Sequence, residues 1–442
     1  MKYLFLLLDF LIICGASNIP LLFFDSGRVL LPLIITINLA VAFILINIFP
    51  GIYKTRKTRF KILAGGADLL LIFVLSTTVD AVIFIKMLLS GGYEVWQYIV
   101  YAVTAVVVCA AVFWNGIIRV YLTSGQLGIT LRVLGAVFGM FPIINIIFLF
   151  KIIKRTQREA AYEIRHDAVE KAREGQNICA TKYPVLLVHG VFFRDRDVFN
   201  YWGRVPEALA LNGATLYYGN QQSALSVKDS AAELAARIKQ IIEETGCEKI
   251  NILAHSKGGL DSRYALSKLD CGKYVATLTT VNTPHRGCIF VEQIFNKLPE
   301  NVQQKMAAAY NAASKAVGDT TPDFLAAVGD LRESACLELN KNVPDCDGVY
   351  YQSIGSVARN AKSGRFPLDI SYPFVKKTDG ENDGLVSVES MKWGREFRLI
   401  TVKGKRGVTH ADVIDLNREN IEGFDVREYF VQVIAELKNK GF

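Results

Sequence analysis

Glutamate is almost absent from the first third of this 442-residue sequence, where it occurs once, at Glu94. That region is mostly apolar, whereas from Lys151 onward the composition is that of an ordinary soluble α/β protein. A chain of this length also exceeds one average domain. The sequence therefore predicts two regions of different kind. A single soluble core of buried helices is the alternative, and the series of long apolar runs argues against it.

Cysteines at metal-site spacing are also missing. Six of the eight cysteines fall in the second region, namely Cys179, Cys247, Cys271, Cys288, Cys336 and Cys346. Their spacing matches no zinc site, leaves a disulfide open and does not fix the redox compartment.

Five apolar runs in the first region are each near the ~20 residues that a helix needs to cross a bilayer. They lie at about 3–24, 29–50, 63–85, 98–118 and 131–150. Asp9 and Pro20 interrupt the first run, and without an A-x-A site it is not a signal peptide. We expect a transmembrane helical domain of four or five spans over 1–155 and a connecting helix over 156–179. Asp68 and Asp80 in the third run either mark a transport path or face other helices.

Basic residues form two clusters beside the apolar runs, Lys54–Lys61 and Lys151–Arg158. Such clusters usually meet lipid headgroups or set topology, so no nucleic-acid partner is expected. The first cluster favours a cytoplasmic loop between the second and third runs. Counting five spans from there places the second region outside the cytoplasm, but puts the second cluster on the outer side against the same rule. A four-span count, in which one later run only dips into the membrane, reverses the answer. We favour the five-span count and a multi-pass cell-membrane protein with an extracytoplasmic second region.

The stretch from Lys249 to Asp261 reads Lys-Ile-Asn-Ile-Leu-Ala-His-Ser-Lys-Gly-Gly-Leu-Asp and predicts a nucleophile elbow. A short apolar strand precedes Ser256, and a helical pattern begins at Leu260. A tight turn between them lifts the serine hydroxyl clear of the sheet and points the N–H groups of the helix at it. Small residues must flank the serine, and Ala254 takes the place of the first glycine, so the motif is A-x-S-x-G.

The second region alternates apolar strands with amphipathic helices. We expect strands near 183–188, 214–218, 250–254, 274–280, 349–354 and 397–402. This alternation predicts an α/β fold in which helices cover both faces of a mostly parallel sheet. Active groups then gather at the carboxyl ends of the strands.

Histidine is scarce, and the five present narrow the choice of a base for Ser256. A serine hydroxyl is a weak nucleophile until a base, usually histidine, takes its proton. His166 lies upstream of the sheet, and His189 ends its first strand. His255 precedes the serine, and its ring should point away from the turn. Of the other two, His410 lies in a loop after the last strand, where the chain can return to the serine. It is favoured over His285, which directly follows a strand.

The acid should lie between the serine and the base, at another strand end. Asp383 fits, in a polar turn before a short apolar run, and would hold the histidine tautomer and stabilise the imidazolium. Asp379 is close enough in sequence to compete. The oxyanion hole needs two backbone N–H groups, which we assign to Lys257, after the serine, and Val191, after the first strand.

The second region contains four motifs in this order: Tyr-Pro-Val-Leu-Leu-Val-His-Gly, Ala-His-Ser-Lys-Gly-Gly, Asn-Thr-Pro-His-Arg-Gly and Asn-Asp-Gly-Leu-Val-Ser. Together they resemble the bacterial triacylglycerol lipases of the α/β-hydrolase superfamily over residues 180–440, which leaves the first region unexplained. The resemblance implies a nucleophile, an acid, a base and two oxyanion donors at Ser256, Asp383, His410, Val191 and Lys257.

Some members of that family hold a structural calcium near the catalytic histidine, and the matching aspartates are Asp369 and Asp412. Two carboxylates with backbone carbonyls suit calcium, and two loop aspartates in turn or capping bonds are the alternative. The insertion at 289–342 takes the place of a mobile helical lid that would open at a lipid surface. A fixed Ala-rich cap is the plainer alternative. The chemistry itself requires no cofactor.

These features predict a membrane-anchored serine ester hydrolase whose catalytic domain spans 180–442. Its substrate would be an acyl-lipid ester such as a triacylglycerol, cleaved through an acyl-enzyme. A phospholipase, thioesterase or acyltransferase would use the same triad. A membrane transport or scaffold protein with an inactive hydrolase-like domain is the reading from another class.

Overall fold

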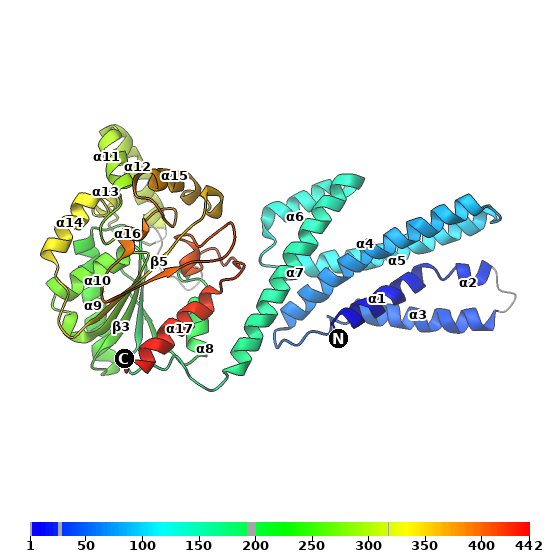
Figure 1. Cartoon of the computed structure of the whole chain (residues 1–442), viewed down its shortest axis with the longest axis horizontal. Coiled ribbons are helices and arrows are strands. Elements are labelled where there is room, and N and C mark those ends of the chain that lie inside the picture. The colour runs from blue at the N-terminus through cyan, green and yellow to red at the C-terminus, as the bar shows by residue number, and fades with distance from the viewer. Residues whose placement is uncertain (1, 25–28, 192–199, 317) are drawn as a thin grey trace. The chain divides into compact units, whose positions relative to one another are not determined.

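The computed structural model describes residues 2–24, 29–191, 200–316 and 318–442. It divides into two compact units, Met1–Ala172 and Arg173–Phe442, called here the N-terminal and C-terminal units (Figure 1). The last helix of the N-terminal unit, α7 (Pro142–Ala172), runs unbroken through residue 155, where we expected a separate connecting helix to begin.

Among the described residues, every regular element of the N-terminal unit is a helix. Three of its helices are long and apolar enough to cross a membrane: α3 (Leu30–Ile48), α4 (Thr58–Ser90) and α5 (Val95–Thr123). The others are α1 (Lys2–Ser17), α2 (Leu21–Phe24), α6 (Gly128–Val137), the 3-10 turn η1 (Phe138–Met140) and α7. Within the described residues the membrane-length helices are thus three, fewer than the four or five spans expected.

The apolar run at 131–150 is not one span, because η1 separates α6 from α7. Proline lacks a backbone N–H and disfavours helical geometry in the residue before it. Phe141 accordingly takes an extended conformation (φ −100°, ψ 110°), and Pro142 opens α7. The run therefore forms a helix–turn–helix.

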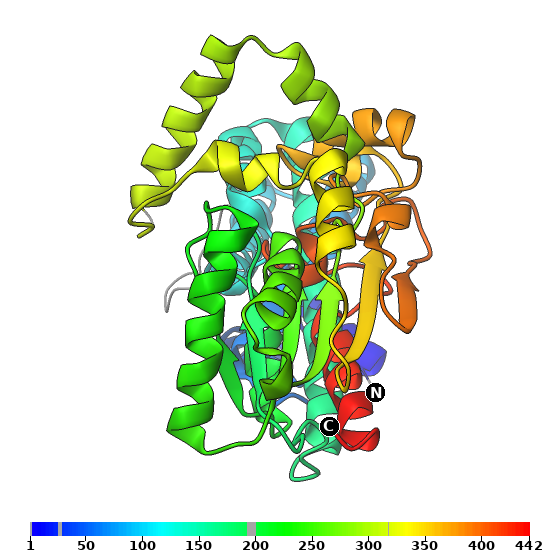
Figure 2. The same cartoon turned by 90° about the vertical axis from the view of Figure 1, so that its left-hand side faces the viewer.

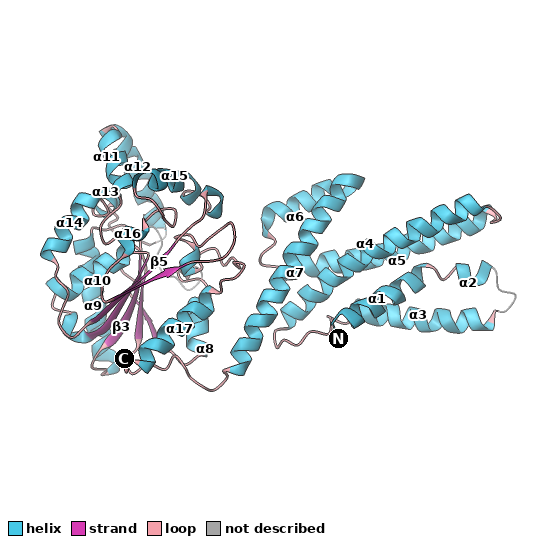
Figure 3. Cartoon of the chain, in the orientation of Figure 1, coloured by secondary structure: helices cyan, strands magenta, loops and turns pink. Residues whose placement is uncertain are grey.

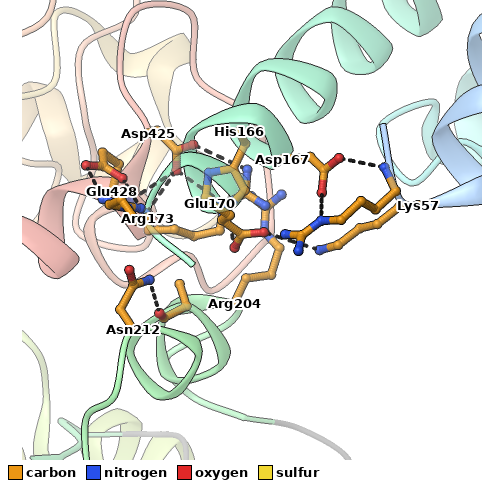
Figure 4. Close-up of polar contacts among 12 residues, drawn as sticks. Lys57, His166, Asp167, Glu170, Arg173, Arg204, Asn212, Asp425 and Glu428 are labelled. Carbon is orange, nitrogen blue, oxygen red and sulfur yellow. Dashed lines mark hydrogen bonds and ion pairs between the residues drawn. The ribbon is translucent and has the colours of Figure 1, made fainter. Parts of the chain in front are cut away.

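Polar contacts tie the loop before α4 to the far half of α7 (Figure 4). The Asp167 carboxylate accepts hydrogen bonds from Thr55 Oγ1 at 2.7 Å and from the Arg56 backbone N–H at 2.8 Å. Lys57 Nζ lies 3.9 Å from Glu170. These contacts bring the first basic cluster and the charged half of α7 to one end of the N-terminal unit.

The two aspartates of α4 both face other segments of the N-terminal unit. This agrees with the alternative in which they contact other helices and do not mark a transport path. Asp80 accepts hydrogen bonds from Ser17 Oγ and Asn18 Nδ2, each at 2.9 Å. Asp68 accepts a hydrogen bond from the Tyr53 hydroxyl.

The C-terminal unit is built on a sheet whose strands are magenta in Figure 3. The sheet is parallel and has six strands in the order β2-β1-β3-β4-β5-β6. The strands are β1 (Val185–Val188), β2 (Leu216–Tyr218), β3 (Ile250–His255), β4 (Val275–Val281), β5 (Tyr350–Ser356) and β6 (Glu396–Ile400). The predicted α/β fold with a covered parallel sheet is confirmed.

Alternate strand residues point to opposite faces of the sheet, and each face has its own helical cover. Val185 and Leu187 of β1 pack in the cluster with α8 (Val205–Leu211) and α17 (Val426–Asn439). Leu186 and Val188 pack in the cluster with α9 (Val227–Thr245) and α10 (Lys257–Lys268). Burial on both sides explains why this strand reads as a continuous apolar run.

The insertion after β4 is helical, as expected. It comprises α11 (Ile289–Lys297), α12 (Glu300–Ala316), α13 (Phe324–Gly329) and α14 (Glu333–Asn342). Helix α12 is largely exposed, with Ala307 and Ser314 as its buried residues. The shorter elements are α15 (Leu368–Thr378), α16 (Val388–Met391), η2 (Gly272–Tyr274), η3 (Ala361–Ser363) and η4 (Asp412–Ile414). Helices α11, α12 and α15 gather at one end of the unit (Figures 1 and 2).

Candidate active site

Ser256 occupies a sharp turn between β3, which ends at His255, and α10, which begins at Lys257. Its backbone has φ 54° and ψ −131°, a conformation that a residue with a side chain adopts at a cost of about 1–3 kcal/mol. The N–H of Ser256 donates to the carbonyl oxygen of Val281 on β4 at 2.9 Å. The neighbouring strand thus holds the turn.

Two glycines make room for the turn. A Cβ on Gly258 would lie 2.3 Å from the carbonyl oxygen of His189. A Cβ on Gly190 would lie 2.8 Å from Cβ of Ser256. Any side chain at these positions would push the end of β1 away from the serine, so the sequence requires glycine at both. Ala254, at the first small position of the motif, is fully buried.

A chain of hydrogen bonds joins the three predicted triad residues. His410 Nε2 lies 3.0 Å from Ser256 Oγ, and His410 Nδ1 lies 2.6 Å from Asp383 Oδ2. An ionised carboxylate only accepts, so Nδ1 carries the proton and Nε2 is free to accept one from the serine. The backbone N–H of His410 also donates to the carbonyl oxygen of Asp383 at 2.9 Å. The structure therefore brings these three side chains together in a geometry suited to proton transfer from the serine.

The Asp383 carboxylate is fully buried, and further donors surround it. Its Oδ1 accepts from the backbone N–H groups of Leu385 and Val386, each at 2.8 Å. Its Oδ2 also accepts from Asn282 Nδ2 at 2.7 Å. We assigned no role to Asn282 from the sequence. The sequence did contain a signal for such a role, because Asn282 directly follows a strand and opens the motif Asn-Thr-Pro-His-Arg-Gly.

The competing residues lie elsewhere. His285 is buried, with Nε2 3.0 Å from Thr280 Oγ1 and its ring stacked on Trp393. Burial, and then the nearby Arg263 guanidinium, lower the pKa of His285 well below its usual range. Asp379 caps the end of α15 through its backbone, and its carboxylate makes no bond to His410.

His255 packs against the base without touching the serine hydroxyl. Its ring centroid lies 4.5 Å from that of His410, and its Nδ1 lies 2.7 Å from the Tyr201 hydroxyl. Burial, followed by the neighbouring His410, lowers the pKa of His255 well below its usual range. A neutral ring therefore backs His410, and it adds no positive charge against an imidazolium there.

One predicted oxyanion donor follows the serine directly, and the other follows the end of β1, which passes close to the serine. Lys257 opens α10, and Val191 follows Gly190, which packs against Ser256. The Lys257 side chain turns into the protein, where Nζ donates to Asp261 at 2.7 Å and to Ser230 at 2.9 Å. Its backbone N–H is therefore the part of Lys257 that can serve the site.

The two aspartates considered as calcium ligands have other partners. Asp412 accepts from Arg406 Nη2 at 3.0 Å and from the Thr409 N–H at 3.0 Å. Asp369 accepts from the N–H of Ile370 at the start of α15. No group of three metal-ligating side chains occurs in the described ranges. The calcium expectation does not fit this arrangement, because a guanidinium already neutralises Asp412.

Comparison with known proteins agrees with this architecture. Residues 183–388 match the family described as the α/β-hydrolase fold. The C-terminal unit thus has the α/β-hydrolase fold. A triacylglycerol lipase of Pseudarthrobacter phenanthrenivorans is 34% identical to this chain over 177 residues, covering 37% of this chain and 55% of that protein.

Two further relatives extend the comparison. A triacylglycerol lipase of Burkholderia plantarii is 34% identical over 177 residues, covering 37% of this chain and 49% of its own. One of Vibrio cholerae is 26% identical over 247 residues, covering 50% and 78%. The chain thus spans about half the length of the first two relatives. Among solved structures, the Staphylococcus hyicus lipase aligns with a TM-score of 0.45 at 17% identity, covering 59% of this chain and 97% of that one.

The pairing of Asp412 with Arg406 generates a prediction for the hydrolase domain. Excess EDTA should leave the melting temperature of the purified protein unchanged, because a protein cation balances Asp412. Arg406→Ala should lower it by roughly 2–6 °C, since a buried carboxylate loses its partner. The exposed Lys405→Ala is the matched control and should melt like the native protein. Melting lowered by EDTA and restored by calcium would instead reinstate Asp369 and Asp412 as metal ligands.

Proposed function

We propose that the C-terminal unit is a serine ester hydrolase that cleaves acyl-lipid esters such as triacylglycerols. The observation that carries this proposal is the hydrogen-bonded chain from Asp383 through His410 to Ser256. The relatives named triacylglycerol lipases support the substrate class. These hydrogen bonds argue against an inactive scaffold protein, because a scaffold would not need an aligned serine, histidine and aspartate.

The mechanism follows from the directions of these hydrogen bonds. His410 Nε2 takes the proton of Ser256 Oγ as the oxygen attacks the ester carbonyl. The backbone N–H groups of Val191 and Lys257 stabilise the oxyanion. His410 then returns the proton to the departing alcohol, and an acyl-enzyme remains. Asp383 stays ionised throughout, fixes the tautomer and stabilises the imidazolium.

Water completes the cycle. His410 removes a proton from water, the hydroxide attacks the acyl carbonyl, and the proton passes to Ser256 Oγ as the fatty acid leaves. A phospholipase, thioesterase or acyltransferase would share these steps and differ in the leaving group or the acyl acceptor. The largely exposed helix α12 favours a mobile lid over a fixed cap, since few of its side chains are buried.

This mechanism predicts that Ser256→Ala lowers kcat/KM for p-nitrophenyl esters by about three orders of magnitude or more. The matched control is Ser334→Ala, an exposed serine in α14, which should keep native activity. Both variants should melt at the native temperature in detergent. Equal activity of Ser256→Ala and the native protein would refute the serine mechanism. A preference for the shortest esters in a chain-length series would favour a general esterase.

We also propose that the N-terminal unit anchors the chain in a membrane and that the C-terminal unit is cytoplasmic. This reverses our expectation from a five-span count. Three membrane-length helices and a helix–turn–helix at 128–172 support the alternative in which the last apolar run only dips into the bilayer. Two hydrogen bonds support it too. Arg59 of the first basic cluster donates to the carbonyl oxygen of Thr123, and Arg155 of the second donates to that of Gln126, in the loop that follows Thr123. Both clusters then lie on one side and satisfy the positive-inside rule. Tethering would keep the enzyme beside its lipid substrate.

Protease treatment of sealed right-side-out vesicles tests this orientation. The C-terminal unit should survive protease added outside and be cleaved after the vesicles are permeabilised. An externally exposed membrane protein in the same vesicles serves as the control for protease activity. Cleavage of the C-terminal unit in sealed vesicles would contradict the cytoplasmic placement.

A further inference from the structure

Helix α15 and Phe366, which lies just before it, expose large apolar side chains. Ile370 and Phe374 are 55% and 57% exposed, and they share one face of the helix because they lie four residues apart. Phe366, just before the helix, is 77% exposed. Soluble surfaces seldom expose aromatic and aliphatic side chains so close together without a partner.

The opposite face of α15 is fixed to the domain. Leu368, Ser371 and Val375 are buried. Val375 packs in one apolar cluster with Phe290 and Val291 of α11. The exposed residues therefore stand on an anchored helix, and their exposure is a property of the fold.

Helix α15 also lies against the loop that carries the acid of the triad. Ser371 Oγ donates to the carbonyl oxygen of Gly384, the residue after Asp383. A Cβ on Gly384 would lie 3.1 Å from Cβ of Leu368. The exposed face of α15 thus belongs to the same end of the domain as the active site.

Positive charge borders this face. Lys362, Lys376 and Lys377 are exposed, and none makes an ion pair within the described residues. Asp369 is the one acidic residue of α15, and it lies in the first turn, away from the two lysines of the last turn. Apolar side chains flanked by unpaired lysines match an interfacial helix that enters the headgroup region of an anionic bilayer.

We propose that the outer face of α15, formed by Phe366, Ile370 and Phe374 with Lys377 on the same face and Lys376 on its exposed flank, is a docking surface for an anionic phospholipid bilayer. The apolar side chains enter the acyl boundary, and the lysines pair with phosphate groups. The contact brings the mouth of the hydrolase domain to the lipid surface. It is a binding property, so it can be tested whether or not the domain cleaves esters.

A photo-crosslinker placed on the helix identifies what covers it. The full chain with Ile370 replaced by p-benzoylphenylalanine is reconstituted in phosphatidylcholine vesicles with or without phosphatidylglycerol, irradiated and digested for mass spectrometry. We expect a phospholipid adduct at position 370 that increases with phosphatidylglycerol. The control is the same replacement of Leu211, which is 62% exposed on α8, a helix far from α15 in Figure 1, and should give no lipid adduct.

Charge reversal separates lipid docking from simple proximity. Lys376→Glu with Lys377→Glu should lower the adduct yield in phosphatidylglycerol vesicles about tenfold, since each lysine near the surface contributes to anionic lipid binding. The double variant should melt like the native protein and keep its activity on a short soluble ester. A crosslink to the N-terminal unit, a crosslink to a second copy, or no adduct in any vesicle would overturn the proposal. Loss of ester cleavage with an intact adduct would count against the proposed activity alone.

Discussion

The tight turn at Ser256 is the constraint on which the rest of the C-terminal unit depends. Ser256 has a side chain and is nevertheless held at positive φ. This strained backbone conformation persists only because the surrounding elements fix it. Strand β4 fixes the serine N–H, and the glycines at 190 and 258 let the end of β1 pass close by. A parallel sheet is needed for this arrangement, because it brings the carboxyl ends of β1, β3 and β4 to one edge.

The same edge supplies a preorganised electrostatic environment. Asp383 is buried, yet Leu385, Val386 and Asn282 donate to it in addition to His410, so the fold itself stabilises its charge. The neutral ring of His255 closes the other side of the base. Such fixed donors need little reorganisation when charge develops during the reaction, which is why a buried polar network can promote catalysis.

Local pattern was sufficient to predict the alternating strands and helices and the sharp turn at Ser256. It also selected His410 among five histidines, and the structure places that ring 3.0 Å from Ser256 Oγ. Side-chain interactions between segments distant in the sequence could not be predicted from local pattern. The amide of Asn282 reaches Asp383 across 101 positions, and Arg406 neutralises Asp412 through side-chain geometry that spacing does not encode. The apolar run at 131–150 was taken as one span because hydropathy counts side chains, whereas Pro142 ends the hydrogen-bond ladder of the backbone.

The proposed mechanism requires that His410 activate Ser256 within the hydrolase domain. Covalent labelling with a fluorophosphonate, followed by peptide mass spectrometry of the full-length protein, tests it most directly, because the reagent needs an activated serine and no particular lipid. We expect one adduct, on Ser256, that forms at least about a hundredfold more slowly in His410→Ala. An adduct on another serine, or labelling of Ser256 at the same rate without the histidine, would contradict it.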